Sequence, residues 1–189
     1  MTKTTILFVF DTARLVPPVF GCCIVAPAAD FTANTVDGTF SLSEASTGCD
    51  HFVIVLHNSS AGGNAMFWNS SPADLFTDSA DNTHYLFAVV GQDESTRASL
   101  IQDIQNSMNG SLAGQVPAVK DHWQSRLHYI TDDARTMEPV AKALEVIAQE
   151  NHVTIDRHQK LREGHNISVT GAIGWIPQIA QVRYWARYY

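Results

Sequence analysis

Polar residues that could perform chemistry follow three apolar runs that we expect to be strands. The runs span 51–57, 84–91 and 126–131. The residues at or just beyond their ends are His57, Asn58 and Ser59, then Gly91, Gln92, Asp93 and Glu94, and finally Thr131, Asp132 and Asp133. Ligands of open α/β sheets bind at the carboxyl ends of parallel strands. If the strands are parallel, we therefore expect these side chains at one edge of the sheet.

One interpretation of this group is a metal-assisted hydrolase. The carboxylates of Asp93, Asp132 and Asp133 would hold a hard cation such as Mg²⁺ or Ca²⁺, and His57 would act as a base or a further ligand. Ser59 would be the candidate nucleophile, with His57 and Asp132 completing the catalytic set. However, the G-x-S-x-G sequence that presents a nucleophilic serine in many hydrolases is absent.

A simpler interpretation needs no catalysis. Asp93 and Asp132, each with the acidic residue that follows it, come just before segments that we expect to be helices. A carboxylate is stabilised at the amino end of a helix, because free backbone N–H groups and the helix dipole both favour negative charge there. We favour this structural role for the acidic residues over metal binding.

Composition limits the classes of partner. The chain has 189 residues, of which 45% are hydrophobic and 16% charged, and its formal net charge is −7. This length suits one domain, or one domain with an appendage. The 12 Lys and Arg residues are scattered, whereas nucleic acids and anionic membrane surfaces require a concentrated basic patch. No apolar run approaches the length of roughly 20 residues that a membrane span needs. We expect neither nucleic acid nor a membrane span as a partner.

Cysteine and histidine give no metal-binding motif. The chain has three cysteines, Cys22, Cys23 and Cys49, too few for a disulfide framework or a four-cysteine zinc site. Buried thiols and a bridge from Cys49 to one of the other two both remain open. None of the eight histidines falls in an H-E-x-x-H motif. The sequence therefore predicts no cofactor.

Secretion and glycosylation are also open. The apolar start of the chain loosely resembles a signal segment, although charges at Asp11 and Arg14 interrupt it and a strand at 5–10 is the interpretation we favour. Four Asn-x-Ser triplets slightly favour a secreted glycoprotein. They begin at Asn58, Asn69, Asn109 and Asn166.

The remaining patterns predict an α/β fold. Residues 31–45 should form a hairpin with Asp37-Gly38 as its two-residue turn. We expect helices at 66–77, 93–110, 117–124 and 138–151, and a second hairpin from strands at 152–157 and 166–172. In the helix at 93–110, Ser95 or Thr96 should be the cap and Gly110 the terminator. Strands that alternate with helices indicate a mainly parallel sheet covered on both faces and closed at one edge by antiparallel strands.

The ends of the chain are distinct from this core. Residues 1–30 are expected to be an initial strand and a connecting segment, and residues 31–189 the main domain. The aromatic C-terminus should be buried, as an edge strand or as a surface for a protein partner. The residues concerned are Tyr184, Trp185 and Tyr188. The abrupt aromatic ending also suggests a segment of a longer polypeptide.

The stretch PAADFTANTVDGTFSLSEASTGCDHFVIVLH at 27–57 resembles the opening of redoxins in the thioredoxin-like superfamily. The resemblance implies a thioredoxin-like sandwich over about 31–170. It also implies a reactive cysteine at a helix start just after the strand at 51–57, where the helix dipole lowers the thiol pKa. The matching segment, Asn58–Ala65, contains no sulfur. We therefore expect a redox-inactive binding or structural module, with the hydrolase as the alternative.

Overall fold

The computed structural model describes residues 25–58, 72–146 and 152–163. Several predictions lie outside these ranges. They are the strand at 5–10, the segment that carries Ser59, the first part of the helix at 66–77, the strand at 166–172, and the aromatic C-terminus with Tyr184, Trp185 and Tyr188.

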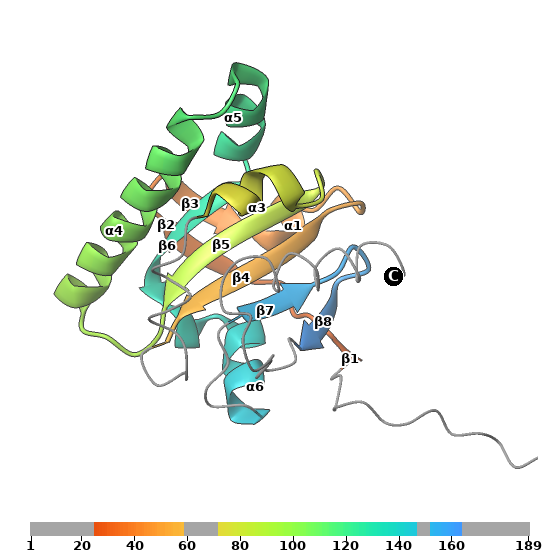
Figure 1. Ribbon diagram of the computed structural model, residues 1–189. Coiled ribbons are helices and arrows are strands. Elements are labelled where there is room, and N and C mark those ends of the chain that lie inside the picture. Colours follow the sequence, from red (N-terminus) through yellow and green to blue (C-terminus); the bar gives the residue numbers. More distant parts are fainter. Residues whose placement is uncertain (1–24, 59–71, 147–151, 164–189) are drawn as a thin grey trace, which may run out of the picture.

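In the described part of the chain, eight strands form one mixed sheet in the order β1-β8-β7-β4-β5-β6-β2-β3 (Figure 1). Strands β4, β5 and β6 are parallel to one another, and the other pairs are antiparallel. The strands are β1 (Val25–Pro27), β2 (Thr32–Thr35), β3 (Gly38–Ser41), β4 (His51–His57), β5 (Thr83–Val89), β6 (Leu127–Asp133), β7 (His152–Ile155) and β8 (Lys160–Glu163).

The central strands follow from their composition. Strand β4 carries the continuous apolar run of the sequence, and its bounds are those predicted. Alternate residues of a strand point to opposite faces, and here both faces are buried: Ile54 is 0% exposed and Val55 is 2% exposed. Branched residues such as these also favour the extended backbone. A strand of this kind is stable only between two covering layers.

Helices supply those layers on both faces (Figure 1). Helices α3 (Ala73–Asp78), α4 (Glu94–Ala113) and α5 (Pro117–Gln124) pack on the face that includes Val53 and Val55. Helices α1 (Leu42–Ala45) and α6 (Glu138–Val146), with the short 3-10 helix η1 (Ala134–Thr136), pack on the face of Phe52 and Ile54. The predicted α/β class, with helices on both faces and an N-terminal hairpin, is confirmed. Its core order, β8-β7-β4-β5 with only β4 and β5 parallel, is that of a thioredoxin-like sandwich.

The bounds of helix α4 differ from the prediction. Asp93 is the N-cap, in place of Ser95 or Thr96, because its carboxylate accepts from the backbone N–H of Thr96. The helix also continues through Gly110 to Ala113, and Gly114 is the C-cap. A glycine weakens a helix but does not end it when apolar residues beyond it pack on the core. Leu112, which is 1% exposed, provides that packing.

Two hairpins also differ in detail. In the first hairpin, Thr35 pairs with Gly38, so Val36 and Asp37 form the turn and Gly38 begins β3 with a φ of 130°. The predicted turn is thus displaced by one residue, although glycine still occupies the position of positive φ. In the second hairpin, the partner of β7 is β8 at Lys160–Glu163, within the charged segment that was predicted to be a connection.

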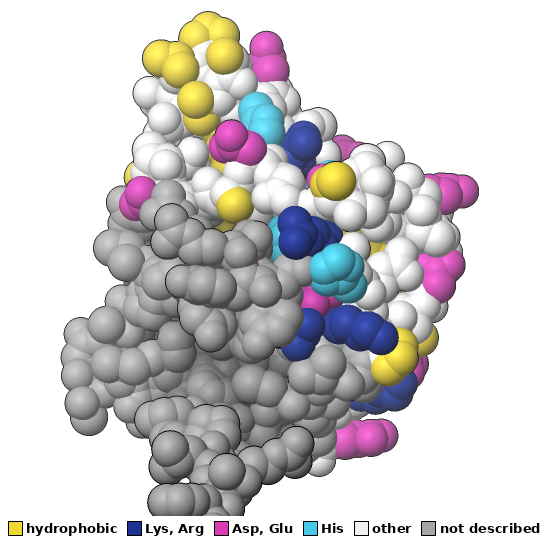
Figure 2. Space-filling model, turned by 90° about the vertical axis from the view of Figure 1, so that its right-hand side faces the viewer, with side chains coloured by type: hydrophobic (Ala, Val, Ile, Leu, Met, Phe, Trp, Pro, Cys, Tyr) yellow, Lys and Arg dark blue, Asp and Glu magenta, His cyan; other side chains and the backbone are white. Residues whose placement is uncertain are grey.

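Strand β1 was not predicted, because it lies in the proline-containing segment at 11–30 and has only three residues. It pairs antiparallel with β8 at one edge of the sheet. Figure 2 shows the side of the molecule that lies to the right in Figure 1, where Lys, Arg and His side chains of the described residues gather. Within the described ranges, no helix is both long enough and apolar enough to cross a bilayer.

Candidate functional site

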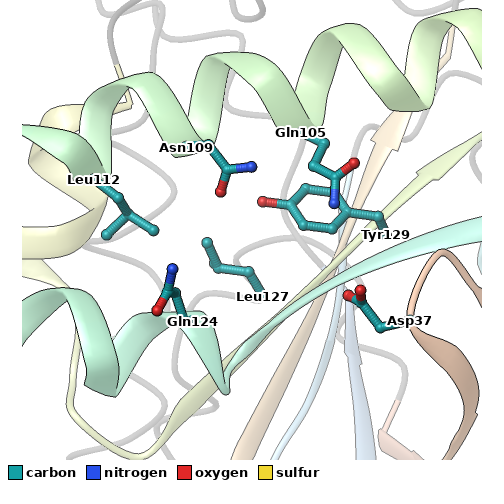
Figure 3. Close-up of a pocket in the computed structure, with 7 residues that line it drawn as sticks. All are labelled: Asp37, Gln105, Asn109, Leu112, Gln124, Leu127 and Tyr129. Atoms are coloured by element: carbon teal, nitrogen blue, oxygen red, sulfur yellow. The ribbon is translucent and has the colours of Figure 1, made fainter.

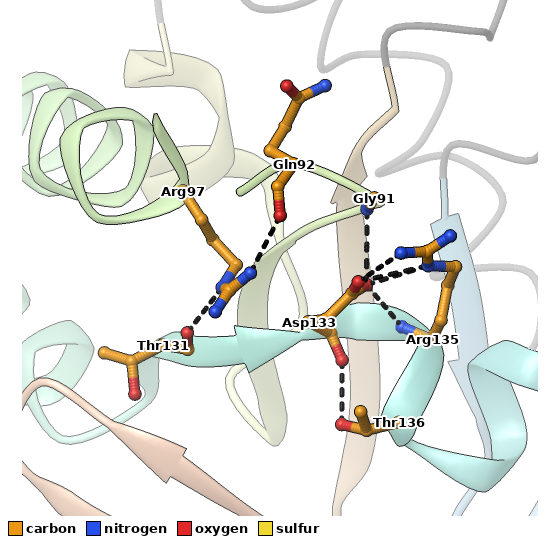
Figure 4. Close-up of polar contacts among 7 residues, drawn as sticks. All are labelled: Gly91, Gln92, Arg97, Thr131, Asp133, Arg135 and Thr136. Carbon is orange, nitrogen blue, oxygen red and sulfur yellow. Dashed lines mark hydrogen bonds and ion pairs between the residues drawn. The ribbon is translucent and has the colours of Figure 1, made fainter. Parts of the chain in front are cut away.

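The carboxyl ends of β4, β5 and β6 lie together, as predicted for parallel neighbours. The N–H of Val90 donates to the carbonyl of His57 at 3.1 Å. The N–H of Gly91 donates to Oδ1 of Asp133 at 3.2 Å (Figure 4). These contacts join residues from the ends of all three strands into one edge. The sequence therefore predicted correctly which loops meet there.

Asp133 is held by residues on either side of this edge. Its carboxylate forms an ion pair with Arg135, in which Nη2 lies 2.6 Å from Oδ2, and it accepts from the backbone N–H of Arg135 at 3.1 Å. Partial burial by itself would raise the pKa of Asp133, but the hydrogen bonds from Arg135 and Gly91 lower it below its ordinary value. Asp133 therefore serves as an ionised N-cap of η1 that also fixes the loop after β5.

Arg97 connects the same loop to β6 from the first turns of α4. Its guanidinium donates to the carbonyl oxygens of Thr131 at 2.8 Å and Gln92 at 2.9 Å (Figure 4). Carbonyl groups at strand ends lack ladder partners and must be satisfied in another way. Arg97 thus links the loop after β5 to β6, and its guanidinium is already engaged in these two hydrogen bonds.

The other two predicted carboxylates point to different partners. Asp93 caps α4 and accepts from Oγ of Ser95 at 2.7 Å and from Oγ1 of Thr96 at 2.7 Å. These hydrogen bonds hold the pKa of Asp93 well below its ordinary value. Asp132 instead accepts from the backbone N–H of Asn34 at 2.8 Å and from its Nδ2 at 3.1 Å, and so attaches the first hairpin to β6.

The edge therefore does not form a cluster of metal ligands among the described residues. No three His, Cys, Asp or Glu side chains in the described ranges are placed to hold an ion together. His57 is half-buried at the end of β4, and burial lowers its pKa, which favours the neutral imidazole at neutral pH. Ser59 is outside the described residues. A catalytic role for His57, Ser59 and Asp132 stays a prediction.

The cysteine of the described residues lies at the opposite edge of the sheet. Cys49, the cysteine within the described residues, is exposed and unbridged, and it precedes the amino end of β4. Strand β4 has seven residues, so at about 3.3 Å per residue its two ends are roughly 20 Å apart. The segment after its carboxyl end, at 58–71, contains no cysteine in the sequence. Cys49 therefore cannot act at the strand ends.

The sequence did not reveal a histidine pair near the amino ends of β5 and β6. Nδ1 of His84 lies 3.1 Å from Nε2 of His128, and the two rings are stacked within 6° of parallel. Phe52 stacks on His84, and Phe40 packs against His128. Burial, and to a lesser degree the charge of His84, lowers the pKa of His128 to about 4. The two histidines are 44 residues apart, and only the strand register brings them together.

A buried ion pair is the second feature that sequence reasoning missed. Nη2 of Arg162 lies 2.8 Å from Oδ2 of Asp156, and the two residues are 6% and 1% exposed. Oδ1 of Asp156 also accepts from the backbone N–H groups of His158 and Lys160, each at 2.9 Å. Because the residues after Arg157 were predicted to be a charged connection, the burial of Arg162 against Asp156 was not expected from the sequence.

Comparisons with known proteins give likenesses of fold. No protein-family model matches the chain, and no curated protein matches it. Several solved structures resemble it, and the three that follow each have a TM-score below 0.5. A yeast mitochondrial 1-Cys peroxiredoxin has 17% identity and a TM-score of 0.46, over 73% of this chain and 64% of that one. A putative thiol-disulfide oxidoreductase from Bacteroides vulgatus has 18% identity and a TM-score of 0.42, over 82% and 94%.

The third structure is ScoI from Bradyrhizobium japonicum with copper bound, with 13% identity and a TM-score of 0.44 over 85% of this chain and 99% of that one. At these levels of similarity, the redox and copper chemistry of the three proteins is not transferred to this chain. The assignment of its thioredoxin-like fold rests on its own strand order and directions.

Proposed function

We propose that this chain is a redox-inactive, thioredoxin-like module that binds another protein. The observation that carries the proposal is the placement of sulfur. In the redoxins that the sequence resembles, a reactive cysteine follows the strand that corresponds to β4, whereas here residues 58–71 contain none. The thiolate is the reactive form of cysteine, so the proposal depends on the absence of a thiol from that segment.

The side chains at the strand ends are already hydrogen-bonded to the protein, and this supports the same proposal. Asp93, Asp133 and Arg97 each make two or more hydrogen bonds within the loops that meet there. A catalytic base or a metal ligand needs a lone pair that is available to the substrate or the ion. Groups engaged in this way stabilise loops, and they give the metal-assisted hydrolase no support.

The partner surface in this proposal includes the aromatic residues Tyr184, Trp185 and Tyr188. Aromatic side chains contribute large contact areas at protein interfaces and are enriched in binding hot spots. A change of all three to serine in the full chain should weaken binding to a partner isolated with the wild type. A triple change of Gln102, Asn106 and Asp103 to serine, all exposed on α4, is the control that should leave binding intact.

The proposal also places the module in a secreted glycoprotein. Two of the four glycosylation triplets begin within the described residues: Asn109 is exposed on α4, whereas Asn58 is 2% exposed. Expression in a secretory eukaryotic host should therefore give a glycan at Asn109 and not at Asn58. Peptide mapping by mass spectrometry before and after deglycosylation distinguishes the two sites.

A direct assay tests the absence of redox activity. The full chain should neither reduce insulin disulfides in the presence of dithiothreitol nor consume hydrogen peroxide above the rate of the buffer, with a thioredoxin and a peroxiredoxin as positive controls. The Cys49→Ser variant should behave in the same way as the wild type. Turnover by the wild type that disappears in Cys49→Ser, or in a variant without cysteine, would overturn the proposal.

A further inference from the structure

A small pocket lies far from the strand ends described above. It opens between α4, α5 and the first half of β6, beside the turn of the β2–β3 hairpin, and has a volume of about 320 Å³ (Figure 3). Pockets that bind small molecules start at roughly 300 Å³. Its lining consists of Asp37, Gln105, Asn109, Leu112, Gln124, Leu127 and Tyr129.

The floor of the pocket is apolar apart from one hydroxyl group. Leu112, Leu127 and Tyr129 are 1%, 5% and 4% exposed. The Tyr129 hydroxyl has no hydrogen-bond partner in the described part of the protein, and Figure 3 shows it directed into the space beneath α4, toward Asn109. A buried hydroxyl without a partner is destabilising, so a native fold that keeps one at the base of a pocket suggests that a ligand supplies the partner.

The rim carries groups that both donate and accept hydrogen bonds. The side chains of Asn109 and Gln124 make no hydrogen bond to the described residues, and Gln105 accepts only a long one, of 3.4 Å, from Gln102. An amide offers two donor hydrogens and one acceptor oxygen. Three amides and one hydroxyl therefore converge above two leucines, an arrangement that suits a ligand with several hydroxyl groups and an apolar face.

Charge narrows the class of ligand further. The lining contains the carboxylate of Asp37 and neither lysine nor arginine, so an anionic ligand would be repelled. Burial and the nearby Asp37 raise the pKa of Tyr129, so its hydroxyl stays protonated and can donate. Asp37 is exposed at the rim, where its charge is screened by water and a neutral hydroxyl can donate to it.

We propose that this pocket binds a neutral polyhydroxylated molecule of about the size of one monosaccharide. The C–H face of the ring packs on Leu112 and Leu127, one hydroxyl accepts from Tyr129, and the others contact the amides of Gln105 and Gln124. A glycan on Asn109 would cover the rim, so this site belongs to the chain without that modification. This site is independent of the proposed redox inactivity, because none of its residues lies at the carboxyl edge of β4, β5 and β6.

The test is titration of the isotopically labelled full chain with D-glucose and with myo-inositol, followed by amide chemical shifts. We expect shifts at pocket residues that saturate with a Kd on the order of millimolar, since a few exposed hydrogen bonds give weak binding. Tyr129→Phe removes only the hydroxyl and should weaken Kd about fivefold to tenfold. Gln124→Ala should have a similar effect, whereas Asn106→Ala, which removes an exposed amide of α4 outside the pocket, should have none.

Several results would overturn the proposal. One is the absence of saturable shifts at the pocket for either polyol. Another is binding that Tyr129→Phe and Gln124→Ala leave unchanged. Preferential binding of D-glucosamine would replace the polyol with a cationic amine held by Asp37. The melting temperature of Tyr129→Phe provides a check that does not depend on ligand. It should equal or exceed that of the wild type, because the variant lacks the unpartnered buried hydroxyl, and a clear drop would show that the hydroxyl already has a partner within the protein.

Discussion

His84 and His128 face each other across neighbouring strands, with Nδ1 of the first 3.1 Å from Nε2 of the second. The bond needs one ring to donate and the other to accept, so at least one histidine must be neutral. Burial lowers the pKa of both residues, and that of His128 falls to about 4. The half-buried pair, with Oδ1 of Asp50 4.0 Å from Nε2 of His84, is therefore held mainly in its neutral form beside Phe52.

The first prediction concerns the dependence of stability on pH. Since the pKa of folded His128 is about 4 and its ordinary value is 6.5, the unfolded chain takes up the proton first as pH falls. The stabilisation is complete above about pH 6.5 and is lost progressively toward pH 4. His128 alone should contribute about 1–3 kcal/mol to this loss. Urea denaturation at pH 7.5, 6 and 5 measures it.

A substitution of His128 alone isolates its contribution to the pH dependence of stability. His128→Gln cannot gain a proton in this range, so its unfolding free energy should change less between pH 7.5 and pH 5 than that of the wild type. His51, His57 and His84, whose pKa values burial also lowers, supply the dependence that remains. His158→Gln, at an exposed site, should retain the wild-type dependence. Equal slopes for His128→Gln and the wild type would contradict the prediction.

The second prediction separates a helix cap from a metal ligand at Asp93. Asp93→Ala should lower the melting temperature, because the N–H of Thr96 loses its acceptor. Asp93→Asn should retain most of the wild-type stability. Asp103→Ala, at an exposed position within α4, should change the stability little. Thermal denaturation should give the same differences in EDTA and in millimolar Mg²⁺ or Ca²⁺. A loss that appears only when the cation is present would support the metal site instead.

The third prediction concerns the buried pair of Asp156 and Arg162. Arg162→Met leaves the Asp156 carboxylate buried without its cation and should cost about 3–5 kcal/mol. Asp156→Asn together with Arg162→Met removes both charges, while the amide oxygen can still accept from the N–H groups of His158 and Lys160. The double variant should therefore be more stable than Arg162→Met alone. Guanidinium denaturation of both variants provides the comparison.

The fourth prediction tests the continuation of α4 through Gly110. A Cβ added at Gly110 meets no atom within 4 Å, so Gly110→Ala should stabilise the helix by about 0.5–1 kcal/mol. Gly91→Ala is the contrasting change, because Gly91 has a φ of 70° and its added Cβ would lie 3.5 Å from the Arg135 guanidinium. We expect it to lower the melting temperature. A melting temperature lowered by Gly110→Ala would indicate that the helix ends where the sequence suggested.

Patterns that are local to one element could be read from the sequence. Strand β4 and helix α5 have the predicted bounds. A short continuous apolar run suits a central strand that is covered on both faces, and a proline is accepted in the first turn of a helix. The alternation of such elements also predicted correctly which strand ends meet at one edge. The α/β class followed from these features, whereas its thioredoxin-like form was implied by the resemblance of residues 27–57 to redoxins.

Where several neighbouring residues could each cap or end a helix, the tertiary structure decided which of them does so. Asp93, Ser95 and Thr96 can each cap a helix, and the packing of α4 on the sheet selected Asp93. Gly110 could have ended that helix, but burial of Leu112 extended it by another turn. These choices depend on contacts made by residues distant in the chain, which a local pattern does not contain.

Strand register accounts for the remaining features. The pairing of Leu86 with His128 sets β5 and β6 so that His84 and His128 meet, and the packing of α4 over β6 encloses the hydroxyl of Tyr129. The sequence by itself determined the central strands and the helices that cover them, but not β1 or β8, and it determined the absence of a cysteine after β4. Only the fold decided which polar side chains are buried together, because sheet register and helix packing set distances between residues that the chain separates by tens of positions.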